Sequence, residues 1–177
     1  MKKLREEFIV PIAVLGAICL LCTWAIAATF AATEPEITRM AAERAQAARL
    51  EVLPEADVFI EIEDVELPNG VRDVFEAGNG AGFVFHTYAP GYAGLVPVMV
   101  GLDADGRIVG VRPLGNNETV GIGDRIEDPA WLALFVGLDN PDGVQGISGA
   151  TVTVDALRNA VRHALDAFEL IREVGAS

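Results

Sequence analysis

The chain has 177 residues, of which 51% are hydrophobic, and its 26 acidic and 13 basic side chains give a formal net charge of -13. That length accommodates one domain of ordinary size plus an appended segment. The acidic balance argues against nucleic acid, whose phosphates need a basic protein surface, and against binding to an anionic membrane surface.

The first part of the chain predicts a membrane anchor. Residues 8–32 carry no charged side chain, and an apolar helix of that length spans a bilayer. Basic residues precede this run and acidic residues follow it, so the positive-inside rule predicts a cytoplasmic tail over residues 1–7 and an extracytoplasmic remainder. A cleaved signal peptide is the alternative, since Ala25-Ile26-Ala27 offers a small-residue cleavage site. The uninterrupted length of the run favours a retained anchor.

The next segment predicts a second helix. Thr33-Glu34-Pro35-Glu36 has the spacing of a capping box, in which a hydroxyl side chain opens the helix and a glutamate follows three residues later. The Ala-rich run after it predicts a stalk helix over residues 33–54, ended by Pro54, and residues 55–177 then form the extracytoplasmic domain.

Short apolar runs bounded by turn residues predict an antiparallel sheet. Residues 58–65 alternate apolar and acidic side chains, the pattern of a half-buried strand. Asp105-Gly106 is typical of a tight turn between two paired strands. The expected strands are residues 58–65, 71–75, 83–85, 95–102 and 108–114.

The last third of the chain combines a polar loop with an amphipathic helix. Residues 116–128 form a long glycine-punctuated connection, a kind that is usually functional, and a short helix begins at Pro129. Apolar side chains then recur at helical spacing, at positions 154, 157, 161, 165 and 168, and Thr153 is a good N-cap candidate for this helix. Thr151 therefore presents a hydroxyl just before a helix N-terminus, where free N–H groups and the helix dipole favour a phosphate.

We expect no ordinary catalytic constellation and no metal site. His86 and His163 lie far apart in the sequence, and we interpret each as structural. Cys19 and Cys22 have the spacing of a redox or zinc motif, but an apolar span lacks the strand–helix setting of the former, and two thiols alone make a poor zinc site.

Two motifs, at residues 118–126 and 148–151, resemble those of a known family and occur in the same order. Ser148-Gly149-Ala150-Thr151 looks like the S/T-G-A-T motif of the FMN-binding domain, which occurs in one subunit of the Rnf electron-transport complex, its G subunit, and in the C subunit of the sodium-translocating NADH:quinone reductase. Residues 118–126 resemble the family's E-T-P-G-L-G-x-K-I loop, and residues 91–94 and 105–110 also fit its pattern. The chain departs from the family at Gln145, where Asp is usual, at Val120, where Pro is usual, and at Asn116-Asn117, where His is common.

The resemblance implies a covalently held flavin. In the family the last Thr of the motif carries FMN as a phosphoester, so the implied attachment point is Thr151. Candidate shelf residues for the flavin ring are Val120, Ile122, Tyr92 and Trp131. The implied cofactor-binding residues are Thr151, Ser148, Gly149, Ala150, Thr153, Glu118, Thr119, Gly121, Ile122, Gly123 and Tyr92.

These observations predict an α+β fold with an N-terminal transmembrane helix, a stalk helix and an antiparallel sheet with packed helices. The expected function is a membrane-anchored flavoprotein subunit that relays electrons in an Rnf-type ion-translocating oxidoreductase, with other membrane subunits as partners and an extracytoplasmic flavin transferase for maturation. The short chain and single span suit the Rnf subunit better than the quinone-reductase subunit. Two alternatives remain open: an FMN carrier of another extracytoplasmic redox chain, and a non-redox scaffold of the same fold without flavin.

Overall fold

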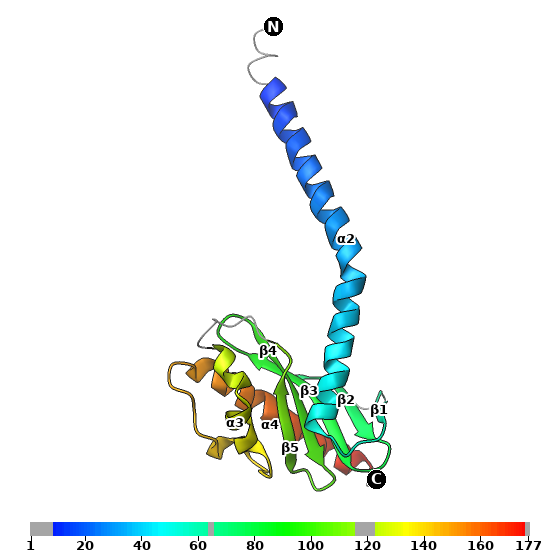
Figure 1. Ribbon diagram of the computed structural model, residues 1–177, viewed down its shortest axis with the longest axis vertical. Helices are drawn as coiled ribbons and strands as arrows, with labels where there is room; N and C mark the ends of the chain where they lie inside the picture. Colours follow the sequence, from blue (N-terminus) through cyan, green and yellow to red (C-terminus); the bar gives the residue numbers. More distant parts are fainter. Residues whose placement is uncertain (1–8, 64–65, 116–122, 176–177) are drawn as a thin grey trace. The chain divides into compact units, whose positions relative to one another are not determined.

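The computed structural model describes residues 9–63, 66–115 and 123–175, and Figure 1 shows the order of its elements. The chain divides into two compact units, Met1–Glu43 and Arg44–Ser177. The first unit contains most of helix α2, and the second contains the last turns of α2, the sheet and the remaining helices.

Helix α2 (Val10–Val52) is one helix where the sequence predicted two. Its apolar first part makes it the one helix in the described residues that is long and apolar enough to cross a membrane. Thr33 does not cap a new helix, because its hydroxyl donates back to the carbonyls of Thr29 and Phe30, at 3.0 and 3.2 Å, as in a helix interior. Pro35 removes one intrahelical hydrogen bond, but the strong helix formers after it continue the helix. The capping-box interpretation is therefore wrong.

The second unit is built on a five-stranded sheet in which every neighbouring pair is antiparallel, as predicted. The strands follow one another in space in the order in which they occur in the chain. The predicted hairpin turned by Asp105-Gly106 is present, and the Asp103 carboxylate closes it by accepting from the backbone N–H of Asp105 and Arg107. The strands are β1 (Phe59–Glu61), β2 (Val71–Ala77), β3 (Gly82–Pro90), β4 (Leu95–Asp103) and β5 (Ile108–Pro113).

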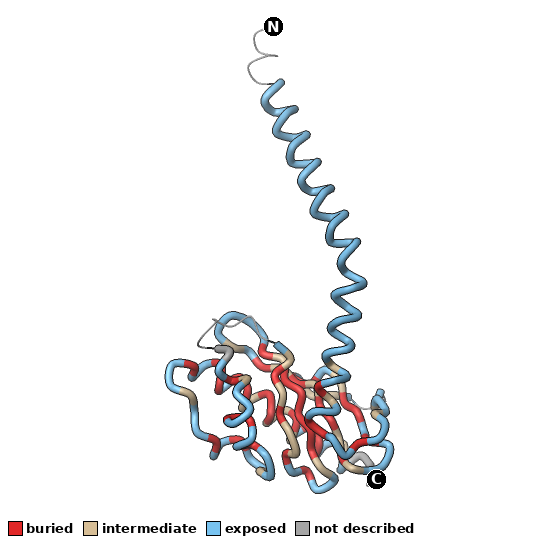
Figure 2. The backbone as a smooth tube through the Cα atoms, viewed as in Figure 1, coloured by how far each residue is buried: buried red, intermediate tan, exposed pale blue. Residues whose placement is uncertain are grey.

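Both faces of this sheet are covered, so the unit is an α+β domain, as predicted. Helix α4 (Thr151–Gly175) covers one face, and alternate strand residues such as Val74, Phe85 and Val98 form the main core with it. The end of α2 covers the other face, where Val52 and Leu53 join a second cluster with the strand residues on the opposite side. Figure 2 shows the central strands as the most continuously buried part of the domain.

Two glycines let the backbone of α2 lie directly on the sheet. A Cβ on Gly101 of β4 would overlap the carbonyl oxygen of Val52, and a Cβ on Gly110 of β5 would come within 2.8 Å of the Val52 Cα. Gly101 and Gly110 are register partners in the β4–β5 ladder, so they form one flat seat. Because no side chain stands between helix and sheet here, the helix end approaches more closely than ordinary packing allows.

Polar groups complete the contact beside the seat. The Arg49 guanidinium lies 3.7 Å from the centre of the Phe75 ring, and burial lowers the pKa of Arg49 although Asp73 and Glu61 oppose this. On β3, Nδ1 of His86 lies 3.0 Å from the Asp73 carboxylate. Burial lowers the pKa of His86 below its usual value, against the opposing effect of Asp73.

The glycine seat predicts the effect of adding a side chain. Gly101→Val should lower the free energy of unfolding by about 2 kcal/mol, because the new atoms must push the end of α2 off the sheet. Thermal unfolding of the full chain in detergent, followed by near-ultraviolet circular dichroism, measures this. Gly94→Ala is the matched control, since nothing lies within 4 Å of a Cβ at Gly94. Equal melting temperatures for Gly101→Val and the control would contradict the seat.

The environment of His86 predicts a pH dependence. The folded pKa lies below the unfolded value of about 6.5, so as the pH falls through that value the unfolded chain binds a proton that the folded chain resists. Stability should therefore fall as the pH drops from about 7, by at most about 1.4 kcal/mol per pH unit from this one group. His86→Gln should flatten this part of the profile, whereas His163→Gln retains His86 and its slope. Parallel profiles for His86→Gln and the unmodified chain would show that His86 contributes nothing.

Candidate functional site

The motif at residues 148–151 forms the turn that starts α4. The Ala150 N–H donates to the Ile147 carbonyl at 3.1 Å, and the Ala150 carbonyl accepts from the Val154 N–H at 2.9 Å, so Ala150 occupies the N-cap position. Thr153 lies inside the first helical turn and is buried. Its prediction as the N-cap is wrong, because the helix begins three residues earlier than its apolar spacing indicated.

The turn exposes two hydroxyls and buries the methyl group between them. Ser148 and Thr151 are exposed, whereas Ala150 is 3% exposed and anchors the turn in the main core. Gly149 has φ of +87°, a conformation that side chains other than glycine's rarely adopt. No atom lies within 4 Å of a Cβ built on Gly149, so a bulky group has room to approach the backbone there.

Long side chains from three elements hold the segment that leads into this turn. The Trp131 indole N–H donates to the Gln145 carbonyl at 2.7 Å, and a terminal nitrogen of Arg158 donates to the Val144 carbonyl. A terminal nitrogen of Arg125 lies 3.4 Å from the Ser148 carbonyl. These three side chains come from α3 (Pro129–Leu132), α4 and η2 (Gly123–Glu127), respectively.

Trp131, a candidate for the apolar shelf under the flavin ring, is buried in the domain. It is 9% exposed, and its ring packs edge to face on Phe135 with the ring centres 5.2 Å apart. It belongs to the core and positions the backbone that approaches the motif. Nothing in the sequence pattern pointed to this role, because the partner of the indole is a backbone carbonyl.

The contact between η2 and the Ser148 carbonyl brings the end of the upstream motif to the start of α4. Gly123, the last predicted site residue of that motif, is the first residue of η2. The preceding loop residues that were predicted to contact the cofactor lie outside the described residues. They are Glu118, Thr119, Val120, Gly121 and Ile122.

The direction of α4 places Tyr92 at the same end of the sheet as the motif. Phe168, near the C-terminus of α4, packs on Phe83 at the start of β3, and His163 contacts the Tyr88 carbonyl nearer the end of that strand. The N-terminus of α4 therefore lies toward the turn between β3 and β4. Tyr92 is 77% exposed in this turn, which a hydrogen bond from Gly91 to Gly94 closes.

The charges around the motif suit an anionic group although the chain is acidic. Arg125 lies beside the turn, and the N-terminus of a 25-residue helix supplies a partial positive charge. Arg158 and Arg162 also lie close to the approach segment, but each pairs with a carboxylate, Asp155 and Asp142, respectively.

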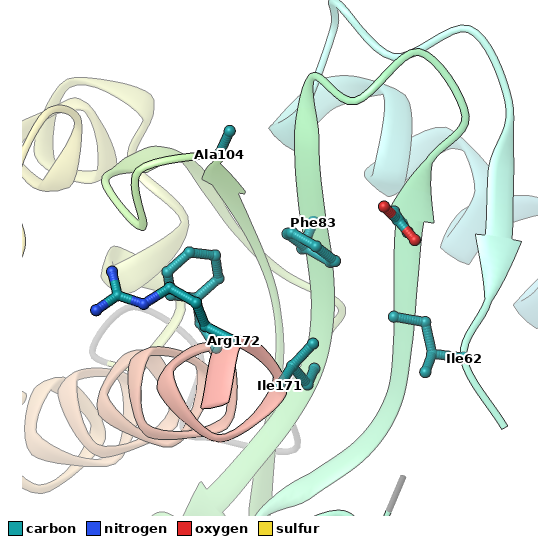
Figure 3. A pocket seen from close by; sticks show the side chains of 7 residues that line it. Ile62, Phe83, Ala104, Ile171 and Arg172 are labelled. Carbon is teal, nitrogen blue, oxygen red and sulfur yellow. The ribbon is translucent and has the colours of Figure 1, made fainter. Parts of the chain in front are cut away.

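The hollow drawn in Figure 3 lies away from the motif. It has a volume of about 410 Å³, and its side chains come from the far end of α4, from β2 and β3, from the segment after β1 and from the turn after β4. Phe168, one of them, is about 25 Å along the helix from Thr151 at 1.5 Å per residue. The lining residues are Ile62, Glu76, Phe83, Ala104, Phe168, Ile171 and Arg172.

Among the described residues, no group of three or more His, Cys, Asp or Glu side chains could hold a metal ion. The two histidines have other contacts. His86 contacts Asp73 between β2 and β3. His163 is part-buried, and its ring fills the space that a side chain at Gly70 would occupy.

Comparison with known proteins covers all of this region. Residues 91–166 match the FMN-binding domain family. The chain is 35% identical to the G subunit of the ion-translocating oxidoreductase complex of Haemophilus influenzae, over 84% of this chain and 84% of that protein. It therefore belongs to the family of these G subunits. The G subunit of Methanosarcina acetivorans is 27% identical over 80% of this chain and 84% of that protein, and that of Pseudomonas aeruginosa is 38% identical over 54% and 52%.

The residues at the start of α4 fit an FMN group. Its phosphate needs a hydroxyl or a cationic partner, and the exposed Thr151, the helix N-terminus and Arg125 provide both. The matched family region contains the turn, η2 and Tyr92, so every predicted cofactor residue lies within it.

Proposed function

We propose that this subunit carries FMN as a phosphoester on Thr151 and passes electrons through it in a membrane-bound, ion-translocating oxidoreductase. The observation that carries the proposal is the exposed Thr151 hydroxyl at the first position of α4, inside the region that matches the FMN-binding domain. The flavin supplies the redox chemistry, while the protein holds and orients it.

The attachment chemistry requires a nucleophilic oxygen that a second enzyme can reach. The Thr151 hydroxyl oxygen forms a bond to the flavin-side phosphorus of FAD, the phosphoanhydride bond to AMP breaks, and AMP leaves. The hydroxyl proton passes to a base of the flavin transferase that catalyses the exchange. Thr151 is exposed at the first position of α4, which supports its proposed role as the acceptor.

The other motif residues hold the attached group. Ser148, Gly149, Ala150 and Thr153 shape the turn on the phosphate side, and Arg125 adds positive charge beside it. Glu118, Thr119, Gly121, Ile122 and Gly123 from the upstream loop, together with Tyr92, are proposed to contact the ring. A covalent bond prevents loss of the flavin by dilution outside the cytoplasm.

The first unit anchors the domain to the membrane through the apolar part of α2. We propose that residues 1–7 are cytoplasmic and the domain extracytoplasmic, because the basic residues precede the span. The partners are then the other subunits of the complex and the extracytoplasmic flavin transferase.

One sequence feature favours a second candidate, a scaffold of the same fold without flavin. Gln145 stands where the family usually has an aspartate three residues before the motif serine. Asp142, the neighbouring carboxylate, pairs with Arg162 and is not available without breaking that pair. Gln145 keeps hydrogen-bonding capacity but lacks the negative charge.

Substitution of Thr151 tests the attachment point. Thr151→Val keeps the shape of the side chain but removes the hydroxyl, so the flavin fluorescence of the denatured protein in a gel should disappear while the melting temperature stays close to that of the unmodified chain. Mass spectrometry of the peptide that contains Thr151, from protein made in the native host, locates the modification.

Two variants control this experiment. Thr151→Ser should keep the flavin because the hydroxyl remains, and Ser148→Ala should keep it because Thr151 is intact. An unmodified Thr151 peptide from the native host at full recovery would mean that the scaffold is the correct function.

The orientation of α2 predicts the compartment of the C-terminus. A reporter fused after Ser177 should be active only if it is one that works outside the cytoplasm, such as alkaline phosphatase. Activity of a cytoplasm-specific reporter at the same position would contradict both the orientation and the route to flavin attachment.

A further inference from the structure

We infer that Trp131 and Arg158 form a clamp that fixes residues 144–150 and so presents Thr151 for modification; this inference rests on the proposed function. The two side chains donate to adjacent carbonyls, those of Gln145 and Val144, respectively. They are therefore positioning residues that act on the backbone that leads to the acceptor hydroxyl.

The segment needs such contacts because it contains no helix or strand between η4 (Pro141–Gly143) and α4. Backbone N–H and C=O groups that become buried outside a helix or sheet must form hydrogen bonds with other partners, such as side chains. Val144 is 4% exposed and has extended dihedral angles, φ −73° and ψ 130°. Trp131 from α3 and Arg158 from α4 therefore supply partners for two adjacent carbonyls of this segment.

The geometry of Arg158 shows that this contact is costly and specific. One terminal nitrogen lies 3.1 Å from the Asp155 carboxylate on the same helix, and the other donates to the Val144 carbonyl. Its Nε is buried and has no hydrogen-bond partner among the described residues, which costs free energy. The planar guanidinium can donate to both acceptors at once, which a lysine cannot do with fixed geometry.

Trp131 holds the next carbonyl from a side chain that is itself packed in the core. Its ring is fixed on Phe135, and Asp128 caps the short helix that carries it by accepting from the Ala130 N–H at 2.9 Å. The clamp therefore links the segment to two elements that are themselves anchored in the main core. Loss of either donor should let the segment sample conformations in which Thr151 is displaced.

The test uses the full chain, purified flavin-free in detergent, with a purified flavin transferase and saturating FAD. Trp131→Phe keeps the aromatic packing and removes the donor, and Arg158→Met keeps most of the aliphatic stem and removes the guanidinium. Arg172→Met is the matched control, because Arg172 lies on the same helix and forms its ion pair with Glu169, far from the clamp.

Two measurements are made on each variant. Amide hydrogen exchange of residues 145–150 reports how firmly the segment is held. The time course of flavin attachment, followed by the mass of the peptide containing Thr151, gives a rate constant and a final amplitude. A positioning role lowers the rate constant, whereas partial unfolding lowers the amplitude and leaves the rate constant of the folded molecules unchanged.

We expect faster exchange and a rate constant about fivefold lower in each clamp variant, with the control unchanged. Exchange equal to that of the unmodified chain would overturn the clamp, and faster exchange with an unchanged rate constant would overturn its role in presenting Thr151. If the unmodified chain gains no flavin on Thr151, the proposed function is wrong, and the exchange data alone then decide whether the clamp exists.

Discussion

The packing of α4 on the sheet determines where the motif lies. The buried side of this helix contains many alanines, among them Ala156, Ala160 and Ala164, each at most 1% exposed. Small side chains let the helix lie close to the strands, and the larger Leu157 and Phe168 fill the remaining space. A helix held along its length in this way presents its first residue at one fixed place. The segment before it has no ladder of its own, so side chains from distant parts of the sequence must supply that rigidity.

The sequence predicted the regular elements well because their signals are local. Apolar runs and turn residues marked the sheet and the Asp105-Gly106 hairpin, and helical spacing marked α4. The alternating run at residues 58–65 was a poorer guide, because the strand there is only Phe59–Glu61 and Ile60 is exposed. The break at Thr33 was wrong because a capping box gives only a local preference, which the helix formers on both sides outweighed. The N-cap at Thr153 was wrong because the positive φ of Gly149 ends the turn earlier, and the apolar spacing carries no information about that dihedral angle.

The sequence pointed to the motif residues of the proposed site but not to the groups that hold the turn, since those groups act through backbone atoms. A hydrogen bond from Trp131 to the carbonyl of Gln145 leaves no trace in residue type at position 145, because every residue has that carbonyl. The same holds for the glycine seat under α2. Gly101 and Gly110 are needed because the Val52 backbone lies against them, and no pattern in the sequence predicts that long-range contact. Residue types in the sequence indicate the proposed chemistry, and long-range contacts determine its geometry.

The charges around the motif bear on the proposed covalent bond to Thr151. The chain carries a net charge of -13, so an anion approaching it meets overall repulsion. Near the start of α4, Arg158 and Arg162 are paired with Asp155 and Asp142, which neutralises much of their charge. Arg125 and the helix N-terminus then supply the attraction, and each such exposed interaction contributes about 1 kcal/mol or less. That is far below the roughly 8 kcal/mol that micromolar binding requires. The proposed ester bond to Thr151 would remove this requirement, and the surrounding charges would then need only to orient the phosphate.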